Sequence, residues 1–143
     1  MGSRTVPGSE ELRVLADAAL THVLFIQVAA SCVKAHHRLI VQDLAPTTIW
    51  LMEDLSRRVG HLSTGTFLDL WWDPRSGLGE AALPALLGQA DPAAQRFPDP
   101  HLLLRSPRIS GSGIQYEIEG TTGNLPDRCG ACILFIGHGH LAE

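Results

Sequence analysis

A short stretch near the middle of the chain gathers side chains suited to acid–base chemistry. Its members, our candidate catalytic residues, are Glu53, Asp54, Arg57 and His61. Carboxylates beside a guanidinium and an imidazole can move a proton to and from a bound molecule if they face a pocket. The same group can instead form a structural ion pair, because an arginine binds a carboxylate through two parallel hydrogen bonds. The sequence leaves both interpretations open.

A second group, near the C-terminus, has the residue types of a metal site: Cys129, Cys132, His138 and His140. Two cysteines and two histidines can bind zinc tetrahedrally. However, Cys132 opens an apolar run, where a lone cysteine packs as a small hydrophobic residue. We therefore expect no metal and no cofactor, and keep this group as an alternative. Cys32 makes the cysteine count odd, which does not indicate a disulfide framework.

A third group combines aromatic rings with isolated polar atoms and forms our candidate ligand-binding set: Gln27, Trp50, Trp71, Trp72 and Tyr116. Gln27 stands in an otherwise apolar run, so its amide needs a hydrogen-bond partner if it is buried. Neighbours on a helix point about 100° apart, so Trp71 and Trp72 cannot both face one core. An apolar pocket with a few placed polar groups is the usual form of a small-molecule site.

Strands must position most of these residues. Apolar runs, alternating or continuous, predict strands over residues 22–30, 38–44, 47–52, 101–105, 114–118 and 131–136. Residues 31–37 are expected to connect the first two strands, with His36 and His37 in solvent.

Helices are predicted to be few and short. Residues 66–72 form one, because Ser63 or Thr64 can cap it and apolar residues recur on one face. Residues 10–20 form another, with acidic side chains in the first turn. The proline-rich residues 73–100 predict a long loop, with one helical turn near residues 81–87, and such loops often serve as lids.

These elements indicate a mainly β fold, an antiparallel sandwich or small barrel with one or two short helices, because strand–helix alternation is missing. The length of 143 residues suits a single domain, residues 1–143. Its net charge of −4 and lack of a basic stripe argue against a nucleic-acid partner. No apolar run approaches the roughly 20 residues of a membrane-spanning helix. With no secretory signal at the N-terminus, we expect a soluble, cytoplasmic protein.

The order of motifs resembles an uncharacterised bacterial family of small β domains. The family pattern is P-x-T-x-(aromatic)-F-x-D-R-P-x-R-x-x-G, followed by F-x-x-x-W and finally G-x-A-x-L-F-I-D. The matching residues are Leu44, Pro46, Thr48, Trp50, Arg57, Gly60, Thr64, Phe67, Trp71, Ser106, Pro107, Arg108, Tyr116, Gly123, Leu125, Pro126, Leu134, Phe135 and Ile136. Two acidic positions depart: Glu53-Asp54-Leu55 replaces Asp-Arg-Pro, and Gly137 replaces the closing Asp. The resemblance covers roughly residues 22–137, and it implies a fold without an activity.

The leading hypothesis is a small-molecule-binding β domain for an apolar metabolite. If it is an enzyme, we expect a cofactor-independent cyclase or isomerase of a biosynthetic pathway, because holding a flexible substrate in a reactive pose lowers the barrier without a cofactor. The alternative is an interaction domain that self-associates, as a homodimer, through exposed tryptophan and edge strands. A Cys/His metal-binding protein is the third hypothesis.

Overall fold

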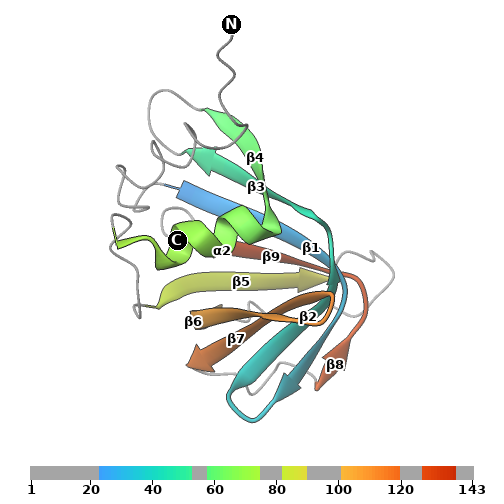
Figure 1. Ribbon diagram of the computed structural model, residues 1–143. Helices are drawn as coiled ribbons and strands as arrows, with labels where there is room; N and C mark the ends of the chain where they lie inside the picture. The colour runs from blue at the N-terminus through green and yellow to red at the C-terminus, as the bar shows by residue number, and fades with distance from the viewer. Residues whose placement is uncertain (1–22, 53–57, 75–81, 90–100, 120–126, 138–143) are drawn as a thin grey trace, which may run out of the picture.

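The described part of the chain is a single antiparallel sheet with one short helix (Figure 1). The computed structural model describes residues 23–52, 58–74, 82–89, 101–119 and 127–137. Within them the sheet has nine strands, and every pairing is antiparallel. The mainly β class predicted from the sequence is therefore confirmed, in its barrel form.

The elements follow one another in the order β1 (Val23–Ala35), β2 (Arg38–Leu44), β3 (Thr47–Met52), β4 (Val59–Ser63), α2 (Thr64–Trp72), β5 (Leu83–Gln89), β6 (His101–Ser110), β7 (Gly113–Glu119), β8 (Arg128–Cys129) and β9 (Cys132–Gly137). No helix in these residues has both the length and the apolar character needed to cross a membrane.

Strand β1 organises the sheet because it is long enough to take different partners along its length. Its second half pairs with β2, and its first half pairs with β3 on one edge and with β9 on the other. From β2 the sheet continues through β7, β6 and β5 to β9, which returns to β1. This closes a ring, and a closed ring leaves none of its strands with a free edge. Strands β3 and β4 extend from β1 beside the ring.

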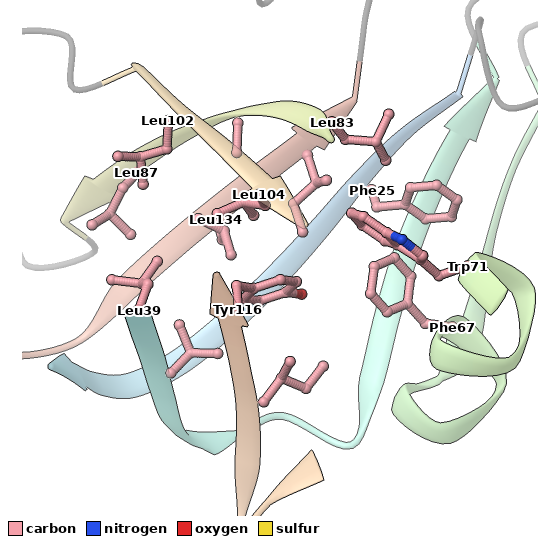
Figure 2. Packing of buried hydrophobic residues seen from close by; sticks show 14 of the residues in the cluster. Phe25, Leu39, Phe67, Trp71, Leu83, Leu87, Leu102, Leu104, Tyr116 and Leu134 are labelled. Atoms are coloured by element: carbon pink, nitrogen blue, oxygen red, sulfur yellow. The ribbon is translucent and has the colours of Figure 1, made fainter. Parts of the chain in front are cut away.

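The ring encloses an apolar core that α2 covers (Figures 1 and 2). Helix α2 begins where predicted, because the Ser63 hydroxyl accepts a hydrogen bond from the Thr66 backbone N–H at 3.1 Å. Its buried face consists of Phe67, Leu68, Leu70 and Trp71. A narrow barrel is filled by its own side chains, and here the filling comes from the strands and from this helix face.

Strand β1 is longer than the sequence predicted. The predicted connection over residues 31–37 is wrong, because residues 31–35 continue β1 and pair with β2. The turn is reduced to His36 and His37, both exposed as expected, with His36 in the left-handed region at φ 57°.

Strand β5 lies inside the segment that was predicted to be a loop. The helical turn expected near residues 81–87 is wrong: these residues pair with β6 and β9 and turn Leu83, Ala85 and Leu87 inward. Pro84 made this stretch resemble a loop, but proline is tolerated near the start of a strand. Residues 59–63, expected to belong to a turn, likewise form β4 against β3. The helix predicted over residues 10–20 lies outside the described residues.

Candidate functional site

The inner face of the sheet beneath α2 brings together four of the five candidate ligand-binding residues. Gln27 comes from β1, Trp50 from β3, Tyr116 from β7 and Trp71 from α2. Their exposed fractions are 1%, 4%, 0% and 1%, so all four are in the core. Strand alternation explains this: residues two apart on a strand share a face, and the inward side chains of β1 and β3 include Gln27 and Trp50.

A chain of hydrogen bonds crosses this interior. The Tyr116 hydroxyl donates to Gln27 Oε1 at 2.7 Å, and Gln27 Nε2 donates to Thr48 Oγ1 at 3.3 Å. Strands β7 and β1 are not neighbours in the sheet, so the first bond spans the barrel. The partner that Gln27 was expected to need is thus present. Leaving a buried group of this kind unpaired would cost about 1–3 kcal/mol.

Tyr116 can act only as a hydrogen-bond donor or acceptor in its neutral form. Complete burial raises the pKa of its hydroxyl well above the usual value, and this outweighs the opposing effect of the hydrogen bond to Gln27. The interior therefore presents neutral polar groups and no negative charge from this residue.

Trp50 has a buried hydrogen-bond donor without an acceptor. Its indole Nε1–H is shielded from solvent, and no partner lies within reach in the structure as described. Gly60 faces the ring from β4, and a Cβ on Gly60 would lie 2.6 Å from it. A side chain at position 60 would thus collide with the indole. Unpaired buried donors are uncommon in folded proteins and are often explained by an additional binding partner.

Aromatic rings form the apolar wall around these polar groups (Figure 2). Phe25 and Phe67 lie edge to face with centroids 5.1 Å apart, Phe67 and Trp71 follow at 6.0 Å, and Trp71 and Tyr116 at 6.3 Å. Two of these rings belong to α2, so the helix supplies the cover of the inner face as well as part of its filling.

The remaining candidate residues lie elsewhere. Trp72 is 42% exposed, as expected for the neighbour of a buried Trp71, and its Nε1–H donates to the Pro107 carbonyl at 3.2 Å. His61 is exposed on β4 and points away from the face that carries Leu62. The structure therefore does not bring His61 to the inner face. Glu53, Asp54 and Arg57 are outside the described residues.

Gly137 explains one departure from the resembled family. Its φ of 142° disfavours any other residue, and a Cβ there would collide with the Val23 carbonyl of the adjacent strand. An aspartate at this position would not fit this backbone.

A charged groove of about 770 Å³ lies at the turn between β1 and β2. Its lining residues are His36, His37, Arg38, Arg105, Glu117, Ile118 and Glu119. Arg105 forms an ion pair with Glu119, and Arg38 stands opposite Glu117 in the β2–β7 register. The groove was not predicted, because cross-strand register brings its residues together from separate segments. Opposite charges line it without an apolar wall, which distinguishes it from ordinary small-molecule sites.

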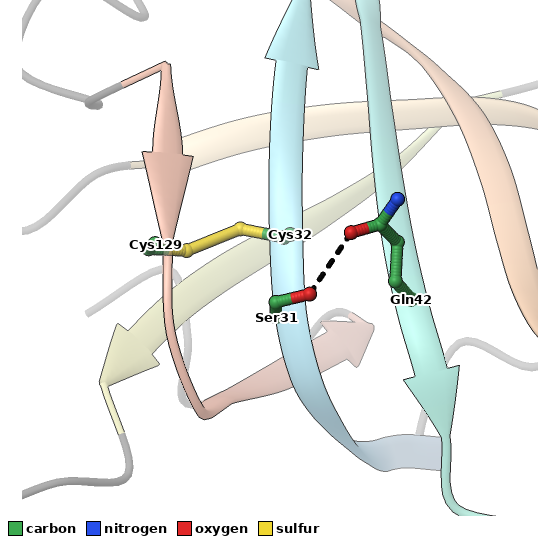
Figure 3. The surroundings of a disulfide bond; sticks show 4 residues. All are labelled: Ser31, Cys32, Gln42 and Cys129. Carbon is green, nitrogen blue, oxygen red and sulfur yellow. Dashed lines mark hydrogen bonds between the residues drawn. A yellow bond between two sulfur atoms is a disulfide. The ribbon is translucent and has the colours of Figure 1, made fainter.

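A cysteine cluster lies at the other end of β1. Cys32 and Cys129 form a disulfide between β1 and β8, with 97 residues of sequence separation (Figure 3). The expectation that the odd cysteine count argues against a disulfide is therefore wrong, because the count says nothing about which two cysteines meet. The third, Cys132, is free and buried, and burial raises the pKa of its thiol to about 11. The three Sγ atoms all lie within 4.8 Å of one another.

The cluster also changes the candidate metal set. Cys129 and Cys132 are close together as that set requires, but Cys129 is bonded to Cys32. His138 and His140 are outside the described residues.

Comparisons with protein-family models, with curated proteins and with solved structures found no match to this chain. The functional interpretation consequently rests on the geometry of these sites.

Proposed function

We propose that the chain is a small-molecule-binding β domain and that its ligand binds beneath α2, against the inner face of β1 and β3. Support comes from the convergence of Gln27, Trp50, Trp71 and Tyr116 on one buried face. Aromatic walls with a few placed polar groups are typical of small-molecule sites. The ligand is mainly apolar and uncharged, because transferring a charge into this interior would be very costly.

The unpaired indole N–H of Trp50 carries the proposal. A ligand with a carbonyl or ether oxygen would accept this hydrogen bond and satisfy the donor. The neighbouring amide of Gln27 and hydroxyl of Tyr116 already satisfy each other. They therefore define the shape and polarity of the floor, and Trp50 supplies the specific contact.

Access to this face requires α2 to move, because Phe67 and Trp71 fill the space above it. The helix is well placed to do so. It follows β4, which among the described strands pairs only with β3, and a hydrogen bond from Trp72 to Pro107 ties its C-terminal end to β6. The apolar body of the ligand would take the place of the two α2 rings.

The test is a titration of the full chain with uncharged apolar ketones, lactones and esters, followed by calorimetry. Trp50→Phe removes the donor and keeps an aromatic ring. The loss of one hydrogen bond, about 1–3 kcal/mol, corresponds to a Kd about 5–150-fold weaker. Trp72→Phe makes the same change outside the inner face and should not weaken binding. Equal losses in both variants, or no loss in Trp50→Phe, would refute this placement of the ligand.

A catalytic role is a finer proposal on the same site. Cofactor-independent cyclisation or isomerisation would use the enclosed shape of the inner face to hold a flexible substrate in its reactive pose. Glu53 or Asp54 would serve as acid or base, and Arg57 would polarise a carbonyl. Single replacement of each by alanine should lower turnover at least tenfold. Unchanged turnover in all three would remove these residues from the mechanism.

Self-association is the second candidate function, and the outer face of β3 and β4 favours it. Val59 is 63% exposed and Ile49 is 40% exposed there, beside the free edge of β4. Free edges with apolar side chains promote pairing with another chain. Val59→Lys should convert a dimer to a monomer in light scattering, and a wild-type monomer at high concentration would eliminate this candidate.

A further inference from the structure

We propose that Cys32, Cys129 and Cys132 form a redox-gated binding site for a soft metal ion, with Cu⁺ as its occupant after the disulfide is reduced. This site is separate from the inner face beneath α2. It rests on the meeting of three sulfur atoms from β1, β8 and β9 at one place.

The backbone holds the three cysteines together independently of the disulfide. Strand pairing sets Cys32 opposite Cys129, and the same edge of β1 sets Ala29 opposite Cys132. Strands β8 and β9 thus follow one line along β1, with Gly130 in the short interruption between them. Breaking the sulfur–sulfur bond leaves this pairing in place, so the thiols remain neighbours.

The spacing of the sulfurs suits a shared ion. With metal–sulfur distances of about 2.3 Å, ligand sulfurs lie roughly 3.8–4.0 Å from one another. The three Sγ atoms already lie within 4.8 Å of one another. Side-chain rotation after reduction is enough to close the difference, without movement of the strands.

The ligand chemistry favours a soft ion. Thiolates select Cu⁺ and Zn²⁺ over harder cations. Structural zinc almost always takes four ligands, whereas Cu⁺ is content with three sulfurs. Cys32 and Cys132 are 2% and 1% exposed, which shields the ion, and the half-buried Cys129 leaves one side open for entry.

Reduction gates the site because the oxidised form offers a single thiol. A dithiol reductant transfers two electrons and two protons to the Cys32–Cys129 disulfide, and the reductant closes to its own disulfide. The protein then has three thiols. Cu⁺ binding forms three copper–sulfur bonds and releases the three thiol protons to solvent. Oxidation of Cys32 and Cys129 restores the disulfide and removes two of the three ligands.

The experiment titrates Cu⁺ into the full chain under anaerobic conditions, against a chelating competitor, before and after reduction. The reduced wild type should bind one equivalent with a thiolate-to-copper absorption band, and the oxidised form should not. Cys132→Ala, which keeps the disulfide, should weaken Cu⁺ binding by more than about 100-fold after reduction, since even the outer-shell partners of metal ligands are worth 10–100-fold. Circular dichroism verifies that each variant is folded.

A second variant separates this site from the C-terminal histidines. His138→Gln combined with His140→Gln should retain the full Cu⁺ affinity. Loss of binding in this variant, or binding unchanged by Cys132→Ala, would overturn the proposal. So would a reduced wild type that binds less than about 0.2 equivalents, or one that binds Zn²⁺ through these thiols in preference to Cu⁺.

Discussion

The hydrogen bond between Tyr116 and Gln27 makes a double-mutant cycle informative about the interior. Tyr116→Phe removes one hydroxyl and leaves Gln27 Oε1 buried without its donor, which lies at 2.7 Å in the wild type. The free energy of unfolding should fall by about 1–3 kcal/mol, the cost of an unpaired buried group. Gln27→Leu should cost a similar amount, because it strands the Tyr116 hydroxyl and takes a partner from Thr48.

The double variant should lose less than the sum of the single losses, by about 0.5–3 kcal/mol, because two apolar side chains leave no unpaired atom between them. Urea denaturation followed by circular dichroism measures all four proteins. Gln115→Leu, the same replacement on the partly exposed side of β7, serves as the control and should change stability by less than about 0.5 kcal/mol. Strictly additive losses, or a loss below about 0.5 kcal/mol for Tyr116→Phe, would show that the two groups are not coupled.

Three further predictions concern pH, the disulfide and a glycine. Folded Tyr116 keeps its proton where the unfolded chain loses it near pH 10, so the free energy of unfolding should hold below about pH 10 and fall above it. Because the chain has one tyrosine, tyrosinate absorbance in an alkaline titration reports it alone and should appear only with unfolding; a normal titration in the folded state would contradict the burial. The raised pKa of Cys132 acts in the same direction from about pH 9. Cys129→Ser opens a loop with 97 residues of sequence separation and should lower stability by about 2–4 kcal/mol in urea denaturation, and a variant as stable as the wild type would rule out a stabilising disulfide. Gly60→Ala should destabilise by about 1–3 kcal/mol because its Cβ meets the indole ring, whereas Gly65→Ala, which meets nothing, should be neutral or stabilising in thermal unfolding.

The sequence predicted the features that depend on neighbouring residues. Helix α2 was predicted because Ser63 and its apolar stripe are local signals. The alternation of β7 likewise placed Ile114, Tyr116 and Ile118 in the core, where they are 0–4% exposed. Gln27 was recognised as a buried polar group because it interrupts an apolar run.

Features that depend on distant pairing could not be predicted in the same way. Tyr116 is 89 positions from Gln27, so the sequence could say that Gln27 needs a partner without saying which one. The segment that forms β5 acquires strand structure from β6 and β9, while its own Pro84 suggests a loop. The disulfide depends on the register of β1 and β8, which the positions of Cys32 and Cys129 do not reveal.

The most direct test of ligand binding beneath α2 is the nuclear magnetic resonance signal of the Trp50 indole N–H. The chain has three tryptophans, and Trp50→Phe identifies the relevant signal by its disappearance. Titration with uncharged apolar ketones, lactones and esters should move the Trp50 signal as its donor gains an acceptor, while the signal of the exposed Trp72 moves little. A ligand that binds and shifts only Trp72, or a set of compounds none of which moves the Trp50 signal, would contradict the proposed site.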